Sequence, residues 1–165
     1  MIIRPALFSE ADSLARLAWR AKALWGYPVD VLEQWRVELS PTETSINTLP
    51  TFVAELDGDV AGWCQLGMND TPVELDHLWV DPDFMRRGVG RALITAACEH
   101  LRAHNVRMLV IDADPNAELF YLHCGAARVG QIAAPIPGKP GRFRPQLELS
   151  VIARPAGSRS LRSSL

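Results

Sequence analysis

The residues best suited to chemistry lie between Glu74 and Leu93, where a basic, glycine-rich turn separates a strand from a helix. The run from Val73 to Val80 is rich in β-branched and aromatic residues, which predicts a strand. Asp81-Pro82-Asp83 ends it, because proline has no ladder donor and restricts the residue before it. Apolar residues then recur at positions 89, 92, 93, 96, 97 and 101, the spacing of one helix face.

The turn before this helix has the features of an anion-binding site. The first backbone N–H groups of a helix lack internal partners, and the helix dipole places its positive end there. Glycines let a ligand approach the backbone closely, and arginine keeps its charge at any ordinary pH. We therefore expect a phosphate or pyrophosphate at the residues of this turn: Arg86, Arg87, Gly88, Val89, Gly90 and Arg91.

Two common phosphate-binding sequences are excluded. A Walker loop requires Gly-x4-Gly-Lys-Ser/Thr, and that string does not occur in the chain. The dinucleotide pattern G-x-G-x-x-G would need its third glycine at Leu93, and no strand-rich βαβ unit precedes it. The turn belongs either to another class of anion site or to the exposed start of an ordinary helix.

Two segments of the chain resemble the GNAT superfamily of N-acetyltransferases. Met85-Arg86-Arg87-Gly88-Val89-Gly90, after Val80, is similar to the acetyl-CoA signature Val-x4-Gln/Arg-x-x-Gly-x-Gly/Ala, except that Met85 replaces Gln or Arg. The run from Asp114 to Ala126 is similar to the family segment Asn-x-x-Ala-x-x-Phe-Tyr-x-x-x-Gly-Phe. There Asp114 takes the usual Asn place and Ala126 replaces the closing Phe.

The resemblance implies an N-acetyltransferase that moves an acetyl group from acetyl-CoA directly to a primary amine, with no metal. The pyrophosphate of acetyl-CoA would lie at the glycine-rich turn, and its pantetheine arm would pair with the strand backbone at Leu78, Trp79 and Val80. Asn116 and Tyr121 of the second segment would also contact acetyl-CoA. Tyr121 would supply a proton to the departing thiolate, since a phenol is protonated at neutral pH.

The general base is expected among the carboxylates of the strand. Glu74 and Asp76 share one face of the strand by alternation, and His77 faces the other way. Some family members carry a glutamate at the position equivalent to Glu74, so Glu74 is the first candidate and Asp76 the second. The alternative is that both are solvated or ion-paired acids.

The amine acceptor is expected near Ala23-Leu24-Trp25-Gly26-Tyr27. In the resemblance, the first pair of helices walls the acceptor pocket, so Trp25 and Tyr27 would contact the substrate, by cation–π attraction if it is cationic. Packing in the core is the alternative for both rings and the preferred interpretation for Trp35. Small amines, amino acids, aminoglycosides and protein amines all remain open as acceptors.

Composition excludes several other classes of protein. With 165 residues, 22% charged residues and a net charge of -2, the chain has no nucleic-acid signature. No apolar run approaches membrane-spanning length, and the start lacks a signal-peptide pattern, which predicts a cytoplasmic protein. Cys64, Cys98 and Cys124 lie far apart and predict free thiols. His100 and His104 have the spacing of a metal pair, but no third ligand accompanies them.

The predicted elements give an α/β fold with a mixed sheet and helices on both faces. Their order, β-α-α-β-β-β-α-β-α-β-β, is that of the GNAT fold. Residues 1–153 form one domain, with helices from Ser9 and from Asp30, a loop over 41–51 and an irregular segment over 134–143. Residues 154–165 lack periodicity and are predicted to be a disordered tail.

Two other kinds of function stay open. The chain is also compatible with a non-catalytic acyl-CoA-binding or sensing module of the same fold. It is compatible as well with an interaction module that uses its Arg/Ser-rich tail on an acidic partner or RNA, although the tail makes a weak basic patch. Dimerisation is common in the family, so a homodimer stays open too.

Overall fold

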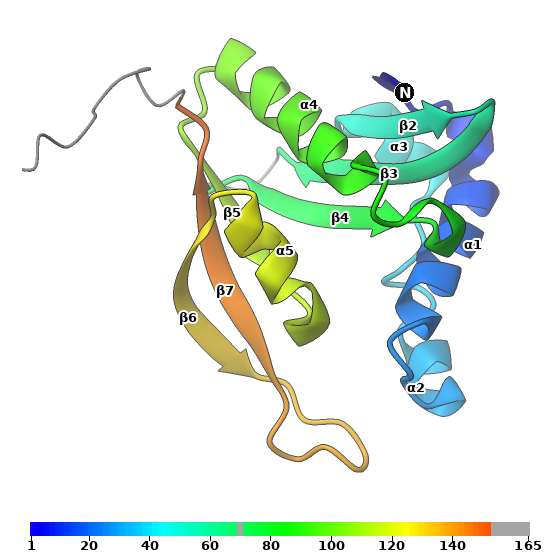
Figure 1. Ribbon diagram of the computed structural model, residues 1–165, viewed down its shortest axis with the longest axis vertical. Coiled ribbons are helices and arrows are strands. Elements are labelled where there is room, and N and C mark those ends of the chain that lie inside the picture. The colour runs from blue at the N-terminus through cyan, green and yellow to red at the C-terminus, as the bar shows by residue number, and fades with distance from the viewer. Residues whose placement is uncertain (69–70, 153–165) are drawn as a thin grey trace, which may run out of the picture.

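The computed structural model describes residues 1–68 and 71–152 and contains one mixed sheet of seven strands in the order β1-β2-β3-β4-β5-β7-β6 (Figure 1). The strands are β1 (Ile2–Pro5), β2 (Thr51–Leu56), β3 (Asp59–Gly67), β4 (Glu74–Val80), β5 (Met108–Asp112), β6 (Ala127–Ala133) and β7 (Phe143–Ser150). The α-helices are α1 (Ala11–Ala23), α2 (Val29–Gln34), α3 (Glu43–Thr48), α4 (Val89–Ala103) and α5 (Glu118–His123). The predicted mixed α/β sheet with helices is therefore confirmed.

Two hydrophobic clusters, one on each face of the sheet, hold the helices in place. The larger contains the apolar face of α4, Tyr121 of α5 and strand residues such as Cys64 and Leu109. The smaller is formed by α1 and α3 against Val53 and Trp63. Neighbouring residues of β2, Val53 and Ala54, belong to different clusters, as the alternation of a strand requires.

Trp63 ties α1 to the sheet. Its side chain is fully buried and its indole Nε1–H donates to the carbonyl oxygen of Leu14 at 3.0 Å. A buried indole needs such an acceptor, and this one belongs to α1 itself. The helix that ends two residues before Trp25 is therefore fixed against the centre of β3.

Strands β4 and β5 are parallel neighbours that pair at a single position, the first residue of β4 and the middle residue of β5. Glu74 is registered with Val110, and the N–H of Val110 donates to the carbonyl oxygen of Val73 at 2.9 Å. In Figure 1, β2, β3 and β4 run across the picture while β5, β6 and β7 run down it, so the two halves of the sheet diverge from that point. The side of β4 that faces β5 is open beyond Glu74.

A bulge in β4 lies next to this opening. Gln65 is registered with His77 and Leu66 with Leu75, which leaves Asp76 as the extra residue of β4. A bulge shifts the parity of every residue after it. Leu78 consequently packs with the larger cluster, as Leu75 does.

The sequence misplaced some local features. The predicted loop over 41–51 contains α3, which Thr42 caps by accepting a hydrogen bond from the Ser45 N–H at 2.9 Å. Ser9 does not cap a long helix: a 3₁₀ turn, Phe8–Glu10, precedes α1, and the Leu7 N–H donates to the Glu10 carboxylate at 2.8 Å. The helix predicted from Asp30 begins at Val29 and spans only six residues, to Gln34.

Other boundaries moved by only a few residues. The strand predicted from Val73 to Val80 begins at Glu74, and β7 begins at Phe143, the last residue of the segment predicted to be irregular. The tail predicted over 154–165 lies outside the described residues. The order of the predicted elements is otherwise retained, with α3 added.

Gly62 of β3 offers a test of this packing. A Cβ at this position would lie 2.7 Å from the backbone oxygen of Trp79 and 2.9 Å from Cγ1 of Val89. Gly62→Ala should therefore lower the free energy of unfolding by about 1–3 kcal/mol, measured by urea denaturation. The control is Gly130→Ala in β6, where the nearest atom would lie 3.9 Å away, and a change within about 0.5 kcal/mol is expected. Equal losses of stability in the two variants would contradict the close packing of β3 against β4 and α4 at Gly62.

Candidate functional site

The start of α4 has the open geometry that an anion site requires. Gly88 is the N-cap residue, with a left-handed φ of 82°, and no side chain caps the helix. The first helical hydrogen bond runs from the Ala92 N–H to the Gly88 carbonyl at 3.0 Å, so the N–H groups before Ala92 have no helical acceptor. A Cβ on Gly88 would meet nothing within 4 Å, so the space beside it is free of protein atoms.

The arginines of this turn differ in their surroundings. Arg86 is exposed and has a φ of 61°, a backbone region that non-glycine residues rarely adopt and that is frequent at ligand sites. Arg87 forms an ion pair with Asp57 at 2.7 Å. Arg91 donates to the carbonyl oxygen of His123 at 3.3 Å. Among the three, Arg86 is the one that the backbone presents in an uncommon conformation.

Gly90 connects the two sequence motifs. A Cβ on Gly90 would lie 3.0 Å from the ring of Phe120 and 3.5 Å from Val80. Glycine therefore lets the first turn of α4 approach both α5 and the end of β4. Val89 is 1% exposed and belongs to the larger cluster, so its side chain serves the core and only its backbone is available to a ligand.

A cavity of about 360 Å³ lies where β4 and β5 diverge. Its walls come from β4, from the segment after β5, from the end of α1 and from the segment before β7. Of the predicted site residues it brings together Trp25, Glu74, Asp76, Leu78, Trp79 and Tyr121. The glycine-rich turn, Asn116 and Tyr27 do not line it. The start of α4 and this cavity are therefore separate places along the same opening.

Tyr121 lies at the inner wall of the cavity. Its side chain is 6% exposed and its ring contacts Phe120 edge-on, with ring centroids 5.1 Å apart. Burial raises the pKa of its phenol well above the ordinary value, and nearby thiol and carboxylate groups add to the shift. The phenol is consequently protonated throughout the neutral range.

The bulge at Asp76 overturns the predicted arrangement of the β4 side chains. With Asp76 as an extra residue, His77 follows Glu74 on the same face instead of facing the other way. Glu74, Asp76 and His77 all line the cavity. The Asp76 carboxylate lies beside Gly67, where an added Cβ would be 2.6 Å from its Oδ1. Strand alternation failed because it presumes an unbroken ladder.

His77 is held as a neutral imidazole. Its ring lies beside that of Trp63, with centroids 4.8 Å apart, and its Nδ1 accepts a hydrogen bond from Trp79 Nε1–H at 3.2 Å. Burial lowers the pKa of His77 to about 4, because the charged form loses its hydration. A neutral imidazole carries no charge with which to attract an ammonium group, whereas the neighbouring carboxylates can attract one.

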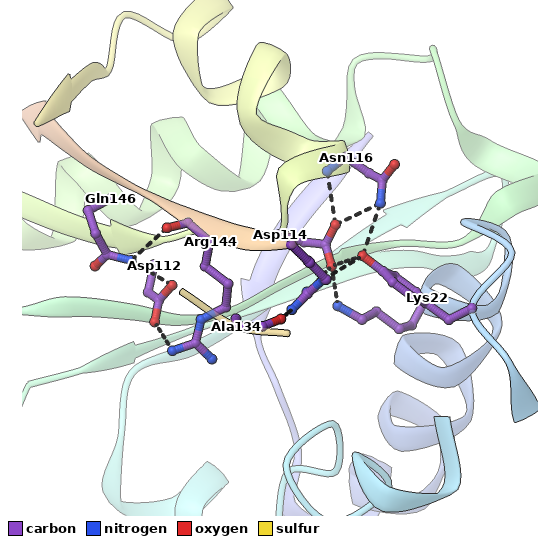
Figure 2. Close-up of polar contacts among 9 residues, drawn as sticks. Lys22, Asp112, Asp114, Asn116, Ala134, Arg144 and Gln146 are labelled. Carbon is purple, nitrogen blue, oxygen red and sulfur yellow. Dashed lines mark hydrogen bonds and ion pairs between the residues drawn. The ribbon is translucent and has the colours of Figure 1, made fainter. Parts of the chain in front are cut away.

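A buried polar cluster on the opposite wall centres on Asp114 (Figure 2). Its Oδ2 accepts hydrogen bonds from Lys22 Nζ at 2.6 Å, from the Tyr27 hydroxyl at 2.8 Å and from Arg142 at 3.2 Å. Its Oδ1 accepts from the backbone N–H of Asn116 at 2.9 Å and from the side-chain amide of Asn116 at 2.8 Å. One carboxylate thus joins α1, the segment before α5 and the segment before β7.

The pKa values of this cluster follow from its burial and charges. Burial by itself would raise the pKa of Asp114, but the charge and hydrogen bond of Lys22 and the Asn116 N–H together lower it, so Asp114 is ionised. Burial lowers the pKa of Lys22, against the attraction of Asp114, and the charge of Arg142 lowers it further. Burial raises the pKa of Tyr27, which is a neutral hydrogen-bond donor here.

Trp25 and Tyr27, predicted to contact the acceptor, both lie beside Lys22. The Lys22 ammonium lies 5.1 Å from the ring centroids of both, 4.7 Å from Trp35 and 5.8 Å from Trp79. Trp25 also lines the cavity, whereas Tyr27 is 5% exposed and faces Asp114. Trp35 both packs against the smaller cluster and lines the cavity.

Lys22, Arg142 and His77 were not singled out from the sequence. Lys22 did carry a signal: it follows Ala18 by four residues and therefore falls on the apolar face of α1, where a lysine needs a buried partner. Arg142 carried none, because its segment is irregular and its contacts come from residues far away in the chain.

Two stacked histidines and three free cysteines of the described part of the chain do not line the cavity. Within it, no group of three or more His, Cys, Asp or Glu side chains could hold a metal ion. His100 and His104 stack on each other with ring centroids 4.3 Å apart. Cys64, Cys98 and Cys124 are free thiols, and burial raises the pKa of each.

Among the residues that the structure describes, no helix combines the length and the apolar character needed to cross a membrane.

Comparison with known proteins agrees with the fold and the two motifs. The family model described as acetyltransferase (GNAT) family matches residues 12–126 of the chain. A GCN5-related N-acetyltransferase from Rhodopseudomonas palustris is 25% identical, with a TM-score of 0.75 over 90% of this chain and 94% of that chain. A search of curated protein sequences gave no significant match.

Two more distant structures share the fold. The PaiA N-acetyltransferase of Thermoplasma acidophilum, in complex with coenzyme A, is 16% identical, with a TM-score of 0.69 over 90% of this chain and 98% of that chain. The ribosomal-protein-S18-alanine N-acetyltransferase of Escherichia coli is 18% identical, with a TM-score of 0.66 over 95% of this chain and 98% of that chain. The GNAT-type architecture predicted from the sequence is thereby confirmed.

The low pKa of His77 predicts a pH-dependent stability. Between about pH 6.5 and about pH 4 the unfolded chain binds a proton at His77 that the folded chain does not, so the free energy of unfolding falls as the pH falls. Glu10 and Asp114, whose pKa values are lowered, add a fall in the same direction. The free energy of unfolding, measured by urea denaturation at pH 7.5 and at pH 4, should fall less in His77→Phe than in the native chain. The difference between the two falls should be on the order of 1–2 kcal/mol. Parallel curves for the two proteins would contradict a buried, neutral His77.

Proposed function

The chain belongs to the acetyltransferase (GNAT) family, and we propose that it transfers an acetyl group from acetyl-CoA directly to the primary amine of a small-molecule or peptide acceptor. One observation carries the proposal: the start of α4, which no side chain caps, and the cavity that Tyr121 lines both lie along the opening between β4 and β5. In the reaction, a bond forms between the acceptor nitrogen and the acetyl carbonyl carbon, and the carbon–sulfur bond breaks. The amine loses a proton and coenzyme A leaves as its thiol.

The start of α4 would bind the pyrophosphate of acetyl-CoA. The N–H groups of Val89, Gly90 and Arg91 have no helical acceptor, and the helix dipole adds positive potential there. Gly88 leaves room for the phosphate oxygens, and Arg86 supplies an exposed positive charge next to it. The residues of the turn fit a diphosphate in both charge and space.

The backbone of β4 would hold the pantetheine arm. Beyond Glu74, β4 has β3 on one side, and its other side faces the opening, because its ladder with β5 is limited to the pair Glu74–Val110. In our proposal, backbone groups in the stretch Leu78, Trp79 and Val80 exchange hydrogen bonds with the amides of the arm, as an added strand would. This supports the carry-over of their role from the family resemblance.

Tyr121 would act as the general acid and a β4 carboxylate as the base. A phenol with a raised pKa stays protonated and can supply the proton that the departing sulfur takes up. Glu74 lines the same cavity and remains our first candidate for the base, with Asp76 second. Either would accept the proton of the amine directly or through a water molecule.

Tyr121→Phe tests the acid. The variant removes only the hydroxyl, so we expect kcat to fall about 100-fold, within the range of general acid catalysis, while the Kd of acetyl-CoA changes less than twofold. Thiol release reports kcat and calorimetric titration reports Kd. If kcat and acetyl-CoA affinity fall together, Tyr121 is structural rather than catalytic.

Gly88→Glu tests the pyrophosphate site. The added carboxylate would project into the free space at the helix start and repel a diphosphate, so the Kd of acetyl-CoA should rise at least 100-fold. Gly138→Glu is the matched control, because Gly138 also has a positive φ, 76° against 82° at Gly88, with open space around it. Tight binding by Gly88→Glu would refute the assignment, and binding without turnover on any amine would favour the sensing module over the enzyme.

A further inference from the structure

The wall of the cavity around Asp114 carries more positive than negative charge. Lys22 and Arg142 both pair with the same oxygen of Asp114, at 2.6 Å and 3.2 Å. The Arg144–Asp112 pair beside them, at 2.7 Å, is balanced. Two cations that share one carboxylate leave one positive charge without a counter-ion.

This surplus charge is buried. The side chains of Lys22, Asp114 and Arg142 are 10%, 6% and 7% exposed, respectively, so water compensates them poorly. Buried charges in proteins are normally paired, since an unpaired one loses its hydration without return. Lys22, Asp114, Arg142 and Arg144 all line the cavity, which makes the cavity the direction from which an anion can reach them.

The neighbouring Arg144 has a buried donor without an acceptor. Its Nε is a buried side-chain nitrogen without a hydrogen-bond partner, and it is the sole such nitrogen or oxygen among the described residues. A buried donor left unpaired destabilises the fold, so its presence needs a reason. The wall thus has both a surplus of charge and a surplus of donors.

The aromatic rings of this wall are unsuited to a cationic group of the acceptor. Lys22 already occupies the space between Trp25, Tyr27 and Trp35, and Arg142 lies over Tyr27 and Trp35 at 5.4 Å and 5.3 Å. A second ammonium there would be repelled by both side chains. The carboxylates of Glu38, Glu74 and Asp76 line other parts of the same cavity and are where an ammonium is attracted.

From this separation of charge we infer that the acceptor is a small amine that also bears a carboxylate, with that carboxylate bound by Arg142 and Lys22 and its amine directed to the acidic wall. The inference rests on the proposed function. A cavity of about 360 Å³ is at the lower end of the range for ligand pockets, roughly 300–1,000 Å³, which favours an amino acid over a folded protein. Arg142 donates from Nε to Tyr27, from Nη1 to the Ala134 carbonyl oxygen and from Nη2 to Asp114, which leaves one N–H on each terminal nitrogen for a carboxylate.

The test compares matched acceptors with the native protein. Each common L-amino acid is assayed beside its primary amide and its decarboxylated amine, which keep the side chain and the amine but lack the carboxylate. Thiol release from acetyl-CoA gives kcat/KM for each member. We expect at least one amino acid to exceed both of its analogues tenfold or more.

Variants then assign the preference to Arg142. The preference is the value of kcat/KM for the amino acid divided by the value for its amide. Arg142→Gln should bring this ratio close to 1 by raising KM for the amino acid. Arg142→Lys keeps the positive charge and should keep most of the preference. A structural defect would lower both acceptors alike and leave the ratio unchanged. Arg128→Gln is the control: Arg128 is on β6, pairs with Glu118 at 3.2 Å and does not line the cavity, so the ratio should stay as in the native protein.

Three results would overturn the inference. Amides or decarboxylated amines used as well as amino acids would overturn it while leaving the acetyltransferase proposal intact. If the preference for amino acids were unchanged in Arg142→Gln, the charged cluster around Asp114 would not be its cause. Failure to acetylate any amino acid would exclude this acceptor class, and if acetyl-CoA were not bound either, the proposed function would fall with it.

Discussion

The divergence of β4 from β5 is the constraint on which the rest of the structure depends. Two parallel strands that meet at Glu74 and Val110 and then separate leave backbone groups of β4 without a neighbouring strand. Such a gap would collapse if nothing held the two halves of the sheet apart. Trp63 ties α1 to the first half, and Tyr121 of α5 packs with the larger cluster near the second. Both the anion site and the cavity lie along the resulting opening.

Asp114 fixes the far side of that opening. It caps the turn before α5 through the Asn116 N–H, and it also receives Lys22 from α1 and Arg142 from the segment before β7. One buried carboxylate therefore sets the distance between three parts of the chain. Because more cations than carboxylates meet there, the same contacts that close the wall also leave it positive, and this positive charge is the basis of the acceptor that we propose.

Local sequence patterns predicted most of the fold for a simple reason. The apolar stripe of α4 and the strand before it, which ends at Asp81-Pro82, depend on neighbours within a few residues. Where a prediction failed, the deciding contact was subtle or distant. The Thr42–Ser45 capping box of α3 was present in the sequence but hidden in a Pro- and Thr-rich run. The bulge at Asp76 arises only when β4 is registered against β3.

The sequence by itself determined the family, the glycine-rich turn and the place of Tyr121 within the second motif, because a motif is a fixed spacing of residues along the chain. Tertiary structure decided which side chains share the cavity. It placed His77 on the face of Glu74, enclosed Lys22 within the rings expected to meet the substrate, and brought Arg142 to Asp114. Burial and charge balance are properties of contacts between segments 92 and 28 residues apart, which no spacing along the chain records.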